Sequence, residues 1–229
     1  MPNEPIQRRL VWSKVLRLCH WSLALATLVL LLSGWLIAWA PERALQVTDA
    51  HYLAAAVLMA ALAVRLGLLF LGGGTASWKV LVPTRHHLQQ GWQVLRSYLT
   101  LGKLPLPRWY AHNPLWAPLY LLLFGVLLLQ VASGLLLLDQ VTLVGGVSLR
   151  ALHHWGWLFL LLFTALHVAA VFFHDAKGTT AEISAMVNGH RYLTLEPLNP
   201  DAAPGTRVVP LEALARELKG SSRERKNKD

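Results

Sequence analysis

The chain has 229 residues, of which 55% are hydrophobic and only 14% charged. Because about a quarter of the residues in an ordinary soluble domain are charged, this composition excludes a soluble globular protein and predicts an integral membrane protein. The formal net charge of +9 could suggest nucleic acid, but anionic lipid headgroups account for it better. The single cysteine, Cys19, excludes a disulfide framework and a cysteine-ligated zinc or iron–sulfur site.

Four apolar runs are long enough to cross a bilayer core of about 30 Å. They are His20–Ala40, His51–Leu71, Leu115–Leu138 and Ala151–Phe173. The first is too long for a signal-peptide core and precedes no small-residue cleavage site, so it is predicted to be retained. The predicted fold class is all-α, an integral membrane four-helix bundle.

Lysine and arginine are distributed unevenly among the connecting segments. The basic segments are 1–19, 75–113 and 175–229, whereas the short links 41–50 and 139–150 hold one arginine each. By the positive-inside rule, both termini and the long link are cytoplasmic in a bacterial inner membrane. We therefore expect a basic cytoplasmic N-terminus, a membrane domain over residues 20–174, and a cytoplasmic tail.

The long link contains an amphipathic pattern from about Thr84 to Leu99. Apolar and polar residues alternate at helical spacing, with Leu88, Trp92, Leu95 and Leu99 opposite Arg85, Gln89, Gln93 and Arg96. This pattern predicts a cytoplasmic amphipathic helix that lies on the membrane surface, although a partner protein could use the same surface.

The third span and the tail carry local signals. Asn113 and Pro114 suit the cap and first turn of the third span. That span contains no histidine, and Ser133-Gly134 would allow close approach of a helix or cofactor. After Pro210, the sequence LEALARELKG predicts a short helix, and Ser221–Asp229 is predicted to be disordered.

The segment 152–175 is apolar yet contains four histidines, which are costly in a bilayer. His153 and His167 are fourteen residues apart. They therefore return to within roughly 40° of one helix face, about 21 Å apart along the axis. One helix thus offers two ligand sites, one near each side of the membrane, which is the layout of a helix that holds two haems.

Each of these sites needs a second histidine at the same depth. Alternating membrane crossings put His20 level with His167 on the inner side, and His51 level with His153 on the outer side. Because the two pairs are far apart and neither has a ready third ligand, a zinc or copper cluster is disfavoured. Without a C-x-x-C-H motif, each haem would be held non-covalently, as b-type.

The remaining histidines are weaker candidates for haem ligands. His154 points about 100° away from His153, and His174 would lie about 10 Å beyond His167. We interpret His154 as interfacial and His174 as a surface or quinone-site residue. Four more histidines fall outside the spans and are expected to be solvated or interfacial: His86, His87, His112 and His190.

Arg65 also lies inside an apolar span and requires an anion, for which a propionate of the inner haem is the natural candidate. Snorkelling of its side chain to the inner headgroups is the alternative.

Several stretches resemble the bacterial cytochrome b561 family, close to the b-type cytochrome subunits of nickel–iron hydrogenases. They are VWSKVLRLCHW, AVRLGLLFLG, HNPLWAPLYLLLFGVLLLQVASGLL, LHHWG, ALHVAAVFFH and AEISAMVNGHR, which lie between residues 11 and 191. The resemblance implies a four-helix bundle with two b haems, ligated by His20 with His167 and by His51 with His153. Where this family usually has an acidic residue after the first histidine of the last span, this chain has His154.

Such proteins pass electrons between a partner redox protein and the quinone pool. We therefore expect a di-haem electron relay that serves as the membrane subunit of an oxidoreductase, with a dehydrogenase, hydrogenase or c-type cytochrome as partner. The alternative is a stand-alone enzyme of the cytochrome b561 type, such as a superoxide:quinone oxidoreductase. A haem-free anchor or transporter would leave the matched histidines unexplained.

Overall fold

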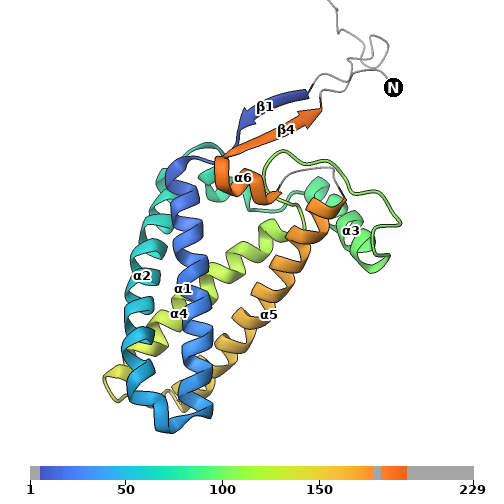
Figure 1. Ribbon diagram of the computed structural model, residues 1–229. Coiled ribbons are helices and arrows are strands. Elements are labelled where there is room, and N and C mark those ends of the chain that lie inside the picture. The colour runs from blue at the N-terminus through green and yellow to red at the C-terminus, as the bar shows by residue number, and fades with distance from the viewer. Residues whose placement is uncertain (1–5, 178–181, 195–229) are drawn as a thin grey trace, which may run out of the picture. The chain divides into compact units, whose positions relative to one another are not determined.

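The computed structural model describes residues 6–177 and 182–194 (Figure 1). The chain divides into two compact units, and Arg8–Leu193 contains the described helices. Of the second unit, Met1–Gln7 with Thr194–Asp229, only Ile6, Gln7 and Thr194 are described. The predicted helix after Pro210 and the predicted disorder at 221–229 lie outside the described residues.

Four long helices form the bundle, as predicted (Figure 1). They are α1 (Lys14–Trp39), α2 (Ala44–Leu71), α4 (Trp116–Leu138) and α5 (Leu149–Ala176). All four are long and apolar enough to cross a membrane. α1 packs along α2 and α4 along α5, and α1 also contacts α5.

The first two helices begin earlier in the chain than the apolar runs that start at His20 and His51. α1 begins at Lys14 because Ser13 caps it, accepting a hydrogen bond from the Leu16 N–H at 3.2 Å. α2 begins at Ala44, directly after the 3₁₀ turn Pro41–Arg43. His20 and His51 therefore lie well inside their helices. The apolar run marks the part of a helix suited to hydrocarbon, whereas the helix itself continues into polar residues at either end.

The bundle has two ends that differ in structure. At the end that we call the hairpin end, α4 and α5 are joined by the antiparallel strands β2 (Leu143–Val144) and β3 (Val147–Ser148). The turn between them has Gly145 and Gly146 at φ of 56° and 81°, which suits a tight hairpin.

The opposite end, which we call the α3 end, carries most of the remaining structure. The predicted amphipathic helix is present as α3 (Arg85–Leu99), and Thr84 caps it through the His87 N–H. Two 3₁₀ turns precede α3, Gly74–Ala76 and Trp78–Val80. The helix α6 (Glu182–Asn188) and the paired strands β1 (Ile6–Leu10) and β4 (His190–Thr194) were not predicted.

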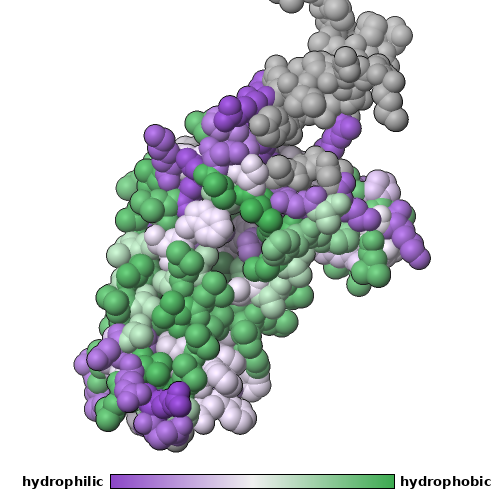
Figure 2. Space-filling model, viewed as in Figure 1, coloured by the Kyte–Doolittle hydropathy of each residue, from purple (hydrophilic) through white to green (hydrophobic). Residues whose placement is uncertain are grey.

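The long helices meet around an apolar core. Its buried residues come from all four helices: Ala26, Leu31, Leu58, Leu62, Leu127 and Leu160. Outside this core, hydrophobic residues cover the flanks of the helices, and hydrophilic residues gather toward both ends (Figure 2). This distribution fits a bundle whose sides face lipid.

Candidate functional site

At the α3 end, the structure brings together His20 of α1 and His167 of α5. Their ring centroids are 6.4 Å apart, with an interplanar angle of 62°. Two imidazoles that bind one metal atom at about 2 Å from each nitrogen have centroids roughly 6 Å apart. The pair can therefore hold one metal atom between its rings.

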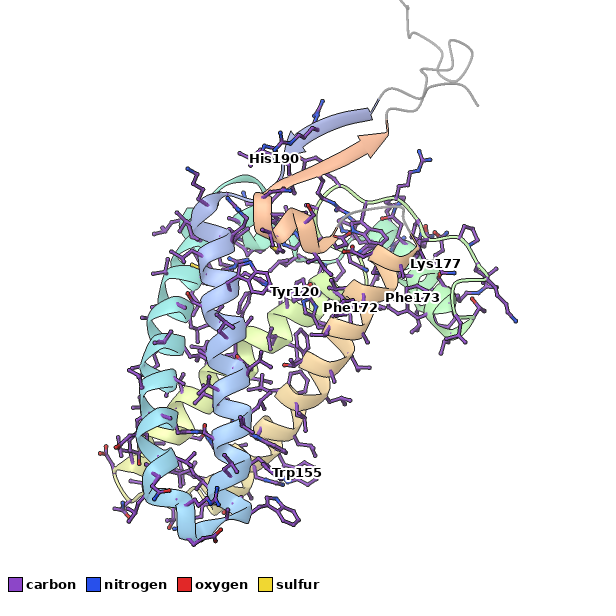
Figure 3. All side chains as sticks on the ribbon, viewed as in Figure 1. Tyr120, Trp155, Phe172, Phe173, Lys177 and His190 are labelled. Atoms are coloured by element: carbon purple, nitrogen blue, oxygen red, sulfur yellow. The ribbon has the colours of Figure 1, made fainter. Side chains whose placement is uncertain are left out.

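Aromatic side chains surround this pair. The Phe163 ring stacks on His167 at 6.0 Å, and the rings of Trp116 and Tyr120 approach His167 at 5.4 and 6.2 Å (Figure 3 labels Tyr120). Trp21 lies beside His20, at 5.4 Å between centroids. Among the described residues, neither histidine has a side-chain hydrogen bond. Packing orients these imidazoles.

At the hairpin end, His51 of α2 and His153 of α5 lie close enough that a charge on one ring would act on the other. Each imidazole is hydrogen-bonded at Nδ1 to a serine of a neighbouring helix. Ser33 Oγ of α1 lies 2.8 Å from His51 Nδ1, and Ser133 Oγ of α4 lies 2.9 Å from His153 Nδ1. All four helices therefore contribute to this site.

A glycine follows each serine and lies against the same imidazole. A Cβ atom on Gly34 would be 3.7 Å from His51 Cε1, and one on Gly134 would be 3.4 Å from His153 Cε1. Ser133-Gly134 is therefore the place where the His153 imidazole approaches α4 closely. The sequence predicted close approach of a helix or cofactor at this dipeptide. The matching dipeptide in α1, Ser33-Gly34, was missed, although its repetition of the same two residues was a visible signal.

His153 and its neighbour His154 face different surroundings. His154 is exposed and stacks on Trp157, with 6.0 Å between centroids and 13° between planes. The next residue, Trp155, is 66% exposed and points away from the bundle (Figure 3). Of His153 and His154, only His153 contacts α4 through Ser133. The spacing argument that favoured His153 agrees with this placement.

Arg65 of α2 is buried near His20. Its side chain is 7% exposed, donates to the Ala76 carbonyl at 3.1 Å, and lies over the Phe124 ring at 5.2 Å. It lies near Cys19, the residue before His20. Such burial does not fit the alternative of snorkelling. Among the described residues, Arg65 forms no ion pair, so its charge is left for an anion.

The expectation that His174 lies at the surface is wrong, because this side chain is 3% exposed. Its Nε2 is 2.7 Å from the Tyr98 hydroxyl and 3.2 Å from Asn113 Nδ2. The Tyr98 oxygen also accepts from Trp116 Nε1 at 3.2 Å. This buried cluster joins α3 and the start of α4 to the end of α5. It was missed because its members are distant in sequence.

The cluster also contains buried nitrogens without a described partner. His174 Nδ1 and Trp109 Nε1 have no hydrogen bond to any described residue, and the two rings lie 5.2 Å apart. Because Asn113 Nδ2 can only donate, His174 Nε2 accepts from it and the ring carries its proton on Nδ1. Two buried N–H donors are therefore available at this place.

His112 was expected to be solvated or interfacial; it is only partly exposed and packs among aromatic rings, so it is not freely solvated. Its ring meets Trp12 at 4.9 Å and Tyr120 at 6.1 Å. Burial, together with the charges of Arg65 and Arg191, lowers the pKa of His112 to about 4. His86 is exposed, as expected, and His87 and His190 are partly exposed.

Arg191 anchors the segment after α5 and was not identified from the sequence. It is 1% exposed, pairs with Glu182, and donates to the carbonyls of Tyr110 and Ala111 at 3.0 Å each. These bonds fasten α6 and β4 to the segment that precedes α4. The described residues contain no group of three or more His, Cys, Asp or Glu side chains that could hold a metal ion.

Comparison with known proteins identifies the family. The family model for prokaryotic cytochrome b561 matches residues 11–189. The chain belongs to the prokaryotic cytochrome b561 family. It is therefore a b-type cytochrome of a bacterial membrane, with several membrane-spanning helices and haem b as its cofactor, as the sequence predicted.

Three relatives in this family carry the name probable Ni/Fe-hydrogenase B-type cytochrome subunit. The relative from Rhodobacter capsulatus is 25% identical over 82% of this chain and 84% of its own length. The relative from Cupriavidus necator is 26% identical over 82% of this chain and 89% of its own length. The relative from Azotobacter chroococcum mcd 1 is 28% identical over 79% of this chain and 87% of its own length. No solved structure matches the chain.

Proposed function

We propose that the chain is a di-haem cytochrome in which four histidines are the axial ligands. His20 and His167 hold one haem at the α3 end, and His51 and His153 hold the other at the hairpin end. The two histidine pairs carry this proposal, above all the 6.4 Å between the His20 and His167 ring centroids.

The donor set fits haem better than a bare metal ion. A protein-bound zinc or copper ion usually takes three or four protein ligands, whereas a haem iron takes two, because the macrocycle supplies the other four. Each site offers two imidazoles, and no described group of three ligands exists. When bound, haem b supplies a one-electron couple, and ligation by two histidines suits electron transfer.

Arg65 is proposed to bind a propionate of the haem at the α3 end. Its guanidinium is buried and has no described ion pair, and it lies near Cys19 and hence near His20. A carboxylate would give this cation a charge-assisted hydrogen bond.

The α3 end is proposed to face the cytoplasm of a bacterial inner membrane. The distribution of lysine and arginine supports this orientation, since the basic link and both terminal segments belong to that side. His20 and His167 are then the inner pair, and His51 and His153 the outer pair.

We infer further that the chain is the membrane subunit of an oxidoreductase complex and relays electrons between a partner redox protein and the quinone pool. The hydrogenase names of its relatives support a hydrogenase or a similar dehydrogenase as the partner. The N–H groups of His174 and Trp109 are proposed to donate to a quinone carbonyl, because both are buried and lack a described acceptor.

Haem content of single-histidine variants tests the four ligands. The purified protein should show a b-type absorption spectrum and two haems per chain. Each of His20→Ala, His167→Ala, His51→Ala and His153→Ala should retain one haem, and the first two should lose the same one. His154→Ala is the matched control and should retain both. Loss of a haem in His154→Ala, with both retained in His153→Ala, would contradict the assignment.

A further inference from the structure

The two histidine pairs differ in what surrounds their imidazoles. His51 and His153 each have a serine hydroxyl at Nδ1, at 2.8 and 2.9 Å. His20 and His167 have aromatic rings around them and, among the described residues, no side-chain hydrogen bond. A difference in polar neighbours is one of the means by which a protein gives two chemically identical cofactors different properties.

The hydroxyl protons decide which partner donates in these two bonds. Ser33 donates its one hydroxyl proton to the Val29 carbonyl at 2.7 Å, with Leu30 O further off at 3.3 Å. Ser133 donates to the Gln130 carbonyl at 3.2 Å. A hydroxyl that gives its one proton to a carbonyl can only accept from an imidazole, and in that arrangement His51 and His153 each carry a proton on Nδ1. The lone pair is then on Nε2, the nitrogen left for a metal.

Each serine also restrains the rotation of its histidine. Ser33 lies on α1 and Ser133 on α4, whereas the histidines lie on α2 and α5, so every imidazole is held from a neighbouring helix. Gly34 and Gly134 then lie in van der Waals range of the same rings. Trp157, whose Nε1 donates to the Leu31 carbonyl at 3.0 Å, packs beside Gly34 next to His51.

We propose that Ser33 and Ser133 are positioning residues that set the Nδ1–H tautomer of His51 and His153 and lower the midpoint potential of the haem between them. This rests on the proposed function, since it requires a haem at that pair. A hydrogen-bond acceptor at Nδ1–H makes Nε2 a stronger donor. Because a stronger donor stabilises iron(III) more than iron(II), the potential falls.

The potentials are measured in His167→Ala, which should retain only the haem at the hairpin end. Into this background we place Ser33→Ala, Ser133→Ala and both together, with Ser33→Thr and Ser133→Thr as variants that keep the hydroxyl. Ser97→Ala is the matched control, because Ser97 is fully buried and its hydroxyl bonds, among the described residues, only the Leu104 carbonyl.

The alanine variants should raise the midpoint potential and weaken haem retention. We expect up to about a tenfold change in the reduced-to-oxidised ratio at fixed potential, or about 59 mV for one electron. Haem affinity should fall by about tenfold or more, as is usual for loss of a hydrogen bond to a ligand. The threonine variants and Ser97→Ala should match the parent. An unchanged potential in the double alanine variant, or an equal change in Ser97→Ala, would overturn the proposal.

A second measurement does not depend on haem. In the full chain isolated without haem and labelled with ¹⁵N-histidine, His51 and His153 should be protonated at Nδ1, and each Ser→Ala change should produce a mixture of tautomers. Protonation at Nε2 in the parent chain would overturn the role of the serines. A chain that takes up no haem but shows the Nδ1–H tautomer would instead contradict the proposed function.

Discussion

Arg65 brings a buried positive charge to the level of His20, where it has a carbonyl and an aromatic ring as neighbours. A fixed positive charge near an iron atom favours its reduced state, because iron(II) carries one positive charge fewer. Arg65→Gln should therefore lower one midpoint potential and leave the other almost unchanged. Arg65→Lys, which keeps the charge, should give a midpoint potential between those of the parent protein and Arg65→Gln. Redox titration of the purified variants measures this, and equal shifts of both potentials would argue against propionate pairing.

His112 should make stability depend on pH. Its pKa of about 4 in the folded protein lies below the ordinary value of 6.5. As the pH falls from 6.5 toward 4, the unfolded chain takes up a proton at His112 that the folded chain does not, so the folded state loses stability. His112→Phe should flatten the fall of the melting temperature over this window.

The buried environment of His112 also indicates which control to use. Arg65 and Arg191 act on its charge, while Trp12 and Tyr120 contact its ring. His86 is exposed on α3, so His86→Phe should leave the pH dependence as it is. If the melting temperature fell equally steeply with pH in His112→Phe and in the parent protein, the pH dependence would not come from His112.

The residues that sequence could predict are those whose positions follow from depth alone. His20, His51, His153 and His167 lie in regular helices, so helix geometry and alternating crossings were enough to predict which of them lie near each other. That these pairs ligate haem stays a prediction. Arg191 could not be found in this way. Its partners at Tyr110 and Ala111 are about eighty residues earlier in the chain, and only the folded α3 end brings them together.

Among the elements, the amphipathic helix was predictable and its surroundings were not. The repeat of apolar residues in α3 has helical spacing, and Thr84 gives a recognisable cap. By contrast, α6 and the strands β1 and β4 are short, and their sequences have no strong pattern. They form because Arg191 and Asp175 hold the segment after α5 in place. Arg191 pairs with Glu182, and Asp175 accepts a hydrogen bond from the Glu182 N–H at 2.7 Å.

α3 is expected to lie in the headgroup region of the inner leaflet. Gly91, Val94 and Ser97 are its buried side, whereas Leu88, Trp92 and Leu99 form an exposed apolar stripe, 58%, 58% and 74% exposed. In helix α3, Arg85 and Arg96 lie beside this stripe rather than opposite it as the sequence predicted. Residues 75–113 contain no acidic side chain. This arrangement suits anionic lipid, with the apolar stripe in the acyl chains.

Spin labels test this position in vesicles of phosphatidylcholine and phosphatidylglycerol. With Cys19 replaced by Ala, labels at positions 92 and 99 should be accessible to oxygen, which concentrates in lipid. Labels at positions 89 and 93 should be accessible to a water-soluble nickel chelate. If all four positions were accessible to the nickel chelate alone, α3 would be free of lipid and available to a partner protein.

In the molecule as a whole, the two histidine pairs have different coverings. At the end of the pair His20–His167, the described residues include the link 72–115, residues 8–13 and α6, which pack together there. The pair at the hairpin end has only the links 40–43 and 139–148 beyond it. A partner could therefore dock on the larger surface at the α3 end or approach the His51–His153 pair directly, and the side from which electrons enter distinguishes these two possibilities.

The protein is expected to need a partner. A two-haem relay requires neither a link of about forty residues nor the tail that follows α5, so this extra surface is more useful to a subunit of a complex than to a stand-alone enzyme. In sealed vesicles that contain the purified protein and quinone, candidate donors are added to one face at a time, and haem reduction is followed by absorbance. Reduction should be slow with superoxide alone and fast with a dehydrogenase or hydrogenase that co-purifies in mild detergent. Rapid quinone-coupled turnover with superoxide and no second protein would instead show that the chain works as an enzyme on its own.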